Sequence, residues 1–211
     1  MRLRMVKYFL FLILLLIFQS ACDQGKRIWE DKDWETLEKK AAAYFSDPSP
    51  NNESDFYKAL PRKKIEKLPG DILKLIFRNE NLEVITQQIH KENRKVIEIV
   101  YRLFLITDAG YTEILIVILN ELIYINPSLY LEKLKAHHDN EVKKIGGLFV
   151  CYTANLNSEE EALIEINQRI EALKRVKDKK LIEIRDRCIE ELKGCKNTYE
   201  NIIKEAKIKN R

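Results

Sequence analysis

Histidine and cysteine, which commonly act as catalytic groups and zinc ligands, are scarce in this 211-residue sequence, with three His and four Cys. The most concentrated group is His137-His138-Asp139, which contains two of the three histidines. Imidazole and carboxylate groups are ligands for zinc. Adjacent residues of a helix point about 100° apart, however, so His137 and His138 cannot both reach one ion from a helix. We therefore expect a cationic or solvated histidine at a helix end and predict no metal site.

Three cysteines, Cys151, Cys188 and Cys195, follow the one at position 22. An oxidising compartment could join two of them in a disulfide. Cys188 and Cys195 are seven residues apart, which on a helix is about 10 Å of rise and too far for a disulfide. Zinc would need closer spacing or more ligands. The first expectation is therefore free, buried cysteines that pack as small apolar side chains.

No other segment has the pattern of a catalytic site. The sequence has neither a Gly-rich phosphate loop nor a Gly-x-Ser-x-Gly segment. The basic triplet Arg62-Lys63-Lys64 is expected to be solvated surface, with contact to a phosphate or a lipid head group as the alternative. We predict no catalytic residue and no cofactor, so an enzyme is not the expected class.

The N-terminal segment has the pattern of an export signal. Three basic residues, Arg2, Arg4 and Lys7, precede an unbroken apolar run of eleven residues, Tyr8–Phe18. This length is typical of the apolar region of a signal peptide and is short for a membrane span. Gln19-Ser20-Ala21-Cys22 follows directly.

This order of charge, apolar run, small residues and cysteine resembles the lipobox of bacterial lipoprotein signal peptides. The resemblance covers residues 1–22 and departs at Gln19, where a lipobox usually has Leu. It implies cleavage before Cys22, acylation of Cys22 with palmitate or similar chains, and a lipid anchor on the periplasmic or extracytoplasmic face of the cell membrane. An uncleaved signal anchor, or an ordinary cleaved signal with a chance cysteine, is the alternative.

The overall charge changes when the leader is removed. The chain has 37 basic and 33 acidic residues, and the leader takes three basic residues and no acidic ones. The remaining chain is then nearly neutral. Binding to nucleic acid has no electrostatic support, and a polybasic membrane patch has little.

Composition and periodicity indicate an all-α fold. The chain has only six Gly and five Pro, and Ile, Leu, Glu and Lys dominate, as in ordered helical proteins. No segment alternates apolar and polar residues at period two, which would indicate a half-buried strand.

The densest apolar stretch after the leader runs from Val96 to Leu134. Its spacing predicts two helices, one from Val96 to about Thr107 and one from about Thr112 to Ile125. The short turn would make them antiparallel neighbours, with Gly110 ending the first helix and Thr112 capping the second. The residues expected to face the core are Val96, Val100, Leu103, Phe104, Thr107, Ile114, Leu115, Ile118, Leu119, Leu122 and Ile123.

Shorter helices are expected on both sides of this pair. One would be capped by Ser54 or Asp55, one would begin at Asn126-Pro127, and one would run from about Glu141 to Ala154. Successive antiparallel pairs over residues 55–156 resemble a HEAT- or armadillo-like α-solenoid. The resemblance is architectural and carries no functional residues to this chain.

Residues 157–211 differ in pattern, because a narrow apolar stripe at heptad-like spacing runs through a charged surface. Ser158 with Glu161 forms a capping box, and Glu165/Arg169 and similar i,i+4 pairs are expected on the charged face. Helices at about 158–176 and 178–206 form either a hairpin docked on the solenoid or a rod-like coiled-coil arm. The stripe consists of Leu163, Ile166, Ile170, Leu173, Leu181, Ile184, Cys188, Leu192, Cys195, Tyr199 and Ile202.

Together these patterns predict a signal peptide (1–21), a tether and first helix with a Pro/Asn-rich loop (22–54), an α-solenoid-like core (55–156) and a charged helical hairpin (157–211). The expected function is a non-catalytic protein-interaction module of the cell envelope. Its partners would be the lipid bilayer, through Cys22, and an envelope protein. A carrier of an apolar ligand, a cryptic enzyme, and an immunity or inhibitor lipoprotein are the alternatives.

Overall fold

The computed structural model describes residues 29–65, 70–138, 150–152 and 158–209, and these segments contain nine helices and no strand. The predicted all-α fold is confirmed. The helices are α2 (Asp31–Ser46), α3 (Pro50–Ala59), α4 (Gly70–Ile76), α5 (Asn79–His90), α6 (Arg94–Leu103), α7 (Ala109–Ile125), α8 (Pro127–His138), α10 (Glu159–Lys174) and α11 (Ile182–Lys209).

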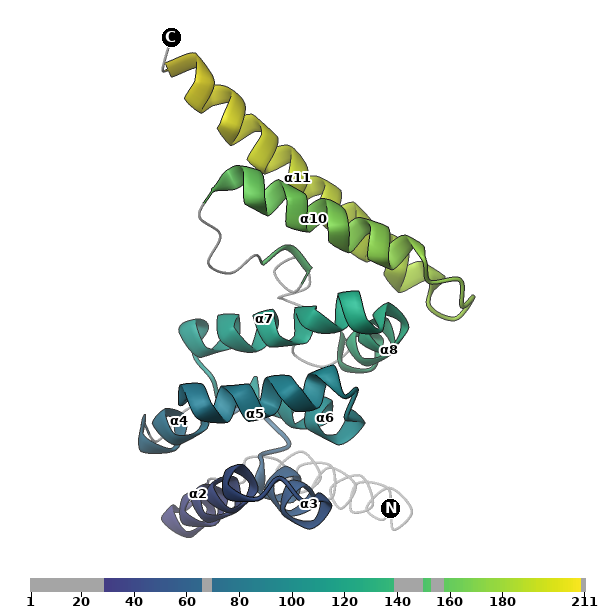
Figure 1. Ribbon diagram of the computed structural model, residues 1–211. Coiled ribbons are helices and arrows are strands. Elements are labelled where there is room, and N and C mark those ends of the chain that lie inside the picture. The colour runs from purple at the N-terminus through teal and green to yellow at the C-terminus, as the bar shows by residue number, and fades with distance from the viewer. Residues whose placement is uncertain (1–28, 66–69, 139–149, 153–157, 210–211) are drawn as a thin grey trace, which may run out of the picture.

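The helices stack in layers, as in an α-solenoid (Figure 1). The pair α2 and α3 lies at one end, α4 to α6 and then α7 and α8 follow, and α10 with α11 lies at the other end. Within this stack α5 packs on α7 and α7 on α10, while α3 packs on α6 and α8 on α11. Each helix therefore buries one side against its pair and another against the next layer, which is how solenoid repeats build a continuous core.

The C-terminal segment is a hairpin and not a single rod. Lys196 Nζ on α11 donates to Asn167 Oδ1 on α10 at 3.0 Å, and Arg185 Nη1 donates to the Val176 carbonyl at 2.8 Å. The contact nearer the C-terminus of α11 is made with the earlier residue of the other segment, so the two helices are antiparallel. Because α11 has 28 residues and α10 has 16, the C-terminal end of α11 extends past α10 (Figure 1).

The predicted apolar stripes of the central helices are buried, with one error. Val96, Leu119 and Leu122 are fully buried, whereas Ile114 is 36% exposed. Ile116, which lies off the predicted stripe, is buried instead. The reason is that α7 contacts α5, α8 and α10, so its buried surface covers more of the helix than one stripe.

Two helix starts differ from the prediction. The Asp108 side chain accepts a hydrogen bond from Tyr111 N and caps α7, so Gly110 lies inside α7 and Thr112 is not its cap. Helix α3 begins at Pro50 after Ser49, earlier than the predicted cap at Ser54 or Asp55. Proline suits the first helical turn because its missing N–H has no partner there in any case.

Other start signals are confirmed. Asn126 Oδ1 accepts from Leu129 N at 2.9 Å at the start of α8, and Ser158 Oγ accepts from Glu161 N at 3.2 Å at the start of α10. The predicted helix from Glu141 to Ala154, with its pair Gly146-Gly147, lies mostly outside the described residues. Among the helices described, none has the length and apolar content to cross a membrane.

Candidate functional site

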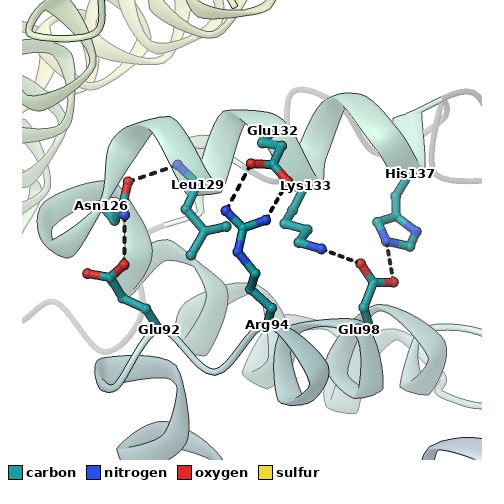
Figure 2. A network of polar contacts seen from close by, with 8 residues as sticks. All are labelled: Glu92, Arg94, Glu98, Asn126, Leu129, Glu132, Lys133 and His137. Carbon is teal, nitrogen blue, oxygen red and sulfur yellow. Dashed lines mark hydrogen bonds and ion pairs between the residues drawn. The ribbon is translucent and has the colours of Figure 1, made fainter.

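The predicted histidine at the end of α8 lies in a polar cluster between α6 and α8 (Figure 2). The Glu98 carboxylate contacts two groups of α8, with Oε1 2.7 Å from Lys133 Nζ and Oε2 3.0 Å from His137 Nε2. The imidazole ring also stacks on Tyr101, with 4.1 Å between ring centres. Because the His137 side chain is only 21% exposed, the solvated alternative of the expected cationic or solvated histidine is wrong for this residue.

The Glu98 cluster (Glu98, Lys133, His137) holds its carboxylate in the charged form. The hydrogen bond from His137, with the one from Lys133, lowers the pKa of Glu98 to about 2, against the effect of burial. A carboxylate beside an imidazole can orient a catalytic base. Here both oxygens of Glu98 are occupied by α8, and the described contacts of His137 are with Glu98 and Tyr101. The Glu98 cluster therefore links α6 to α8 through two hydrogen bonds.

Two further polar contacts lie beside the Glu98 cluster, where α6 and the residues just before it meet α8 (Figure 2). Arg94 forms two hydrogen bonds with Glu132, at 2.7 and 3.2 Å, and Asn126 Nδ2 donates to Glu92 at 2.7 Å. These pairs lie in a row with the Glu98 cluster and fix the register of α8 against α6.

A second polar group surrounds Arg169, which is 2% exposed. Its guanidinium donates to the carbonyl oxygens of Val150 at 2.7 Å and Tyr152 at 2.9 Å, and to Tyr124 Oη at 3.3 Å. Glu165, one turn earlier on α10, forms the ion pair. The pair Glu165/Arg169 was predicted on the charged surface, so its location is a correction. One feature of the sequence could have predicted that Arg169 is buried, because Arg169 lies at heptad-like spacing from Ile166 and Leu173.

The segment 150–152 is fixed to the solenoid by more than Arg169. Asn120 Nδ2 on α7 donates to the Tyr152 carbonyl at 3.3 Å, and Tyr152 Oη donates to Glu113 at 2.7 Å. The same segment is joined covalently to α11, because Cys151 and Cys195 form a disulfide with 6.2 Å between their Cα atoms. It therefore connects α7, α10 and α11.

The disulfide corrects the expectation that all three cysteines are free. Cys188 and Cys195 are not joined to each other, as their helical spacing predicted, and Cys188 is free and buried. Burial raises the pKa of the Cys188 thiol to about 12, so the thiolate that would act as a nucleophile is disfavoured. Nearby, the Tyr130 hydroxyl is buried without a hydrogen-bond partner among the described residues.

The end of α11 has two exposed isoleucines, Ile202 and Ile208, which lie about 120° apart around the helix. Ile202 is 43% and Ile208 66% exposed, and a shallow surface hollow is lined by Glu200, Ile203, Lys204, Lys207 and Ile208. Cys188, Leu192, Cys195, Tyr199 and Ile202 follow one another at alternating spacings of four and three. The heptad-like stripe of α11 therefore continues to Ile202, which the register of the hairpin places opposite the first turn of α10.

Two further predictions concern the lipidation site at Cys22 and the absence of a metal site. Cys22, the predicted lipidation site, lies outside the described residues. Within the described residues, no group of three or more His, Cys, Asp or Glu side chains is arranged to hold a metal ion.

Comparison of the chain with protein-family models, with curated proteins and with solved structures gives no match.

Proposed function

We propose that this chain is a bacterial lipoprotein, tethered through an acylated Cys22, that serves as a non-catalytic protein-interaction module of the cell envelope. The tether rests on the order of the N-terminal residues, in which Arg2, Arg4 and Lys7 precede the apolar run Tyr8–Phe18 and then Ser20-Ala21-Cys22. Such a signal directs a chain out of the cytoplasm.

The Cys151–Cys195 disulfide supports export. Disulfides persist in the periplasm and on cell surfaces and are reduced in the cytosol of most organisms. The two cysteines are 44 residues apart in sequence yet meet in the fold, and the hydrogen bonds of Arg169 to Val150 and Tyr152 hold the carbonyls on either side of Cys151. A structural bond of this kind suits a protein that works in an oxidising compartment.

The two exposed isoleucines at the end of α11, Ile202 and Ile208, carry the interaction proposal. Exposure of Ile202 (43%) and Ile208 (66%) to water is unfavourable, and burial of these side chains against a partner would lower the free energy. Ile202 continues the apolar stripe of α11 that faces α10, so its partner would be an envelope protein that offers an apolar helix. Lys204 and Lys207 beside it favour acidic residues on that partner.

The test is affinity capture from detergent-solubilised envelopes, followed by identification of the bound proteins. The bait is the full chain, with Ile202→Ser/Ile208→Ser as the variant and Ile114→Ser/Ile125→Ser, at exposed isoleucines of α7, as the matched control. The Cys22→Ser form tests whether capture needs the tether. A protein recovered with wild type and the α7 control, and lost with the α11 variant, is the expected result. Equal recovery by all forms would contradict a role for α11.

A further inference from the structure

A group of cations gathers around Tyr57 on α3. The Arg102 guanidinium carbon lies 3.6 Å from the centre of the Tyr57 ring, and Lys95 Nζ lies 4.6 Å from it. Arg102 Nη1 also donates to the Tyr57 carbonyl at 2.8 Å. Lys95 and Arg102 are seven residues apart, so both lie on one face of α6. That face is turned toward α3.

The loop after α3 brings two more cations to this surface. Ile65 N donates to the Leu105 carbonyl at 3.2 Å, which places the loop beside the end of α6. Arg62 and Lys64 in this loop are exposed. Arg62 and Lys64 of the basic triplet thus lie near the end of α6, and the surface here called the Tyr57 patch consists of Tyr57, Arg62, Lys64, Lys95 and Arg102.

The charges of the Tyr57 patch are only partly balanced by the described part of the protein, where Glu53 lies one turn before Tyr57 on α3. None of its four cations forms an ion pair with a carboxylate of the described residues. Three carboxylates on the same helices are hydrogen-bonded to other residues: Asp55 to Lys40 at 2.8 Å, Glu98 to Lys133 at 2.7 Å, and Glu53 to Asn93 Nδ2 at 2.6 Å. Cations that share one aromatic ring repel each other, and an anion nearby would lower that repulsion.

We infer that the Tyr57 patch binds the anionic head groups of a phospholipid bilayer, an inference that rests on the proposed tether at Cys22. Helices α2 and α3 form the first layer of the stack (Figure 1). Eight residues separate Cys22 from the start of α2, and eight residues span at most about 28 Å. A tether at Cys22 therefore keeps this layer within reach of the bilayer surface, where basic side chains are attracted to anionic lipids.

The surface chemistry favours lipid over a protein partner. The exposed large apolar side chains of the described residues are Ile114, Ile125, Ile164, Ile202 and Ile208, and none of them lies on α3 or α6. A protein interface has an apolar core inside its polar rim, whereas attraction to anionic head groups needs only basic charge.

Vesicle sedimentation tests the inference. The chain from residue 23 is suitable, because every buried apolar residue of the described core lies between Leu37 and Leu192. Vesicles contain phosphatidylcholine alone or with about one-third phosphatidylglycerol, and each basic residue at an anionic surface is worth about fivefold in the partition coefficient. Lys64→Glu/Lys95→Glu should therefore weaken binding to the anionic vesicles by at least about 25-fold.

The matched control is Lys177→Glu/Lys179→Glu, in the exposed turn between α10 and α11, which changes the net charge equally at the other end of the stack. It should stay within about twofold of wild type, since it is remote from the surface that binds. Circular dichroism checks that both variants fold. Absent binding to anionic vesicles, or equal loss in both variants, would overturn the inference. So would displacement by inorganic phosphate beyond that by chloride at equal ionic strength, because a discrete phosphate site would then explain the binding.

The chain that starts at residue 23 lacks Cys22, so the vesicle experiment reports on the Tyr57 patch alone. A failed tether would appear only as missing acylation of the full chain.

Discussion

Glu98 is the residue whose ionisation matters most to the packing of α6 on α8. Its pKa of about 2 lies below the ordinary value of 4.5 because His137 and Lys133 hydrogen-bond to the carboxylate. A lowered folded-state pKa stabilises the protein above pH 4.5, and that contribution is lost as the pH falls from about 4.5 to 2. The pair of contacts is then worth about 2 kcal/mol at neutral pH, allowing for partial exposure.

Glu98→Gln should therefore lower the free energy of unfolding near pH 7 and flatten its decline between about pH 4.5 and 2. Urea unfolding at a series of pH values measures both effects. Glu183→Gln, at an exposed i,i+4 pair with Arg187, is the control and should leave the profile unchanged. A wild-type profile that is flat over this range would contradict the role given to Glu98.

Arg169 should be among the least replaceable side chains. Arg169→Ala would leave the carbonyls of Val150 and Tyr152 and the Glu165 carboxylate without their partner, at a cost of about 3–5 kcal/mol. Arg187→Ala, at its exposed pair with Glu183, should cost less than about 0.5 kcal/mol. Chemical denaturation of both variants gives the comparison, and a similar small loss in each would mean that Arg169 is not buried as described.

At this scale the sequence is a limited guide. The i,i+4 spacing of Glu165 and Arg169 is the same as that of Glu183 and Arg187, yet one pair is buried and the other exposed. The difference arises from the neighbours in space, namely Tyr124 and the segment 150–152. His137 was misjudged for the same reason, because its partner Glu98 is 39 residues earlier in the chain.

At the scale of elements, the disulfide joins the segment before α10 to α11. Closing a loop of 44 residues stabilises the folded state by about 4 kcal/mol in the chain-entropy account. Cys195→Ser should therefore lower the melting temperature, and a reductant should lower that of wild type similarly. Cys188→Ala should keep the sensitivity to reductant, since its thiol is free. Wild type that melts at the same temperature with and without reductant would contradict the bond.

The two sides of α7 provide a second test at this scale. Leu119→Ala should cost about 2–5 kcal/mol because the side chain is fully buried. Ile114→Ala should cost less than about 1 kcal/mol because that side chain is 36% exposed. Thermal or urea unfolding measures both. Similar losses at the two positions would mean that the buried side of α7 is assigned incorrectly.

The existence of the helices was predictable and several of their boundaries were not. Apolar periodicity and the caps Asn126 and Ser158 are local signals, and both caps function as predicted. The start of α7 was misplaced by a few residues, because Asp108, Gly110 and Thr112 all have local features of helix ends. The pairing of Cys151 with Cys195 could not be predicted, since it depends on how α11 folds back along α10.

At the scale of the whole molecule, the stack gives the two ends different properties. The first layer, with the Tyr57 patch beside it, follows the segment that contains Cys22, whereas the α10–α11 hairpin lies at the far end (Figure 1). A tether at Cys22 and the exposed isoleucines at the end of α11 would thus act at opposite ends of one solenoid. Under the proposed function, this arrangement would place the surface for a protein partner away from the bilayer.

Acylation of Cys22 is the central claim of this account, and incorporation of labelled palmitate tests it most directly. Wild type and Cys22→Ser are expressed in the same cells, and label and membrane retention are measured for each. Two or more acyl chains anchor a protein stably, at about 0.8 kcal/mol per buried CH₂. Label on wild type alone, with the variant unprocessed or shed, is the predicted result. Equal membrane retention of both forms without label would contradict the claim and identify residues 5–21 as an uncleaved signal anchor.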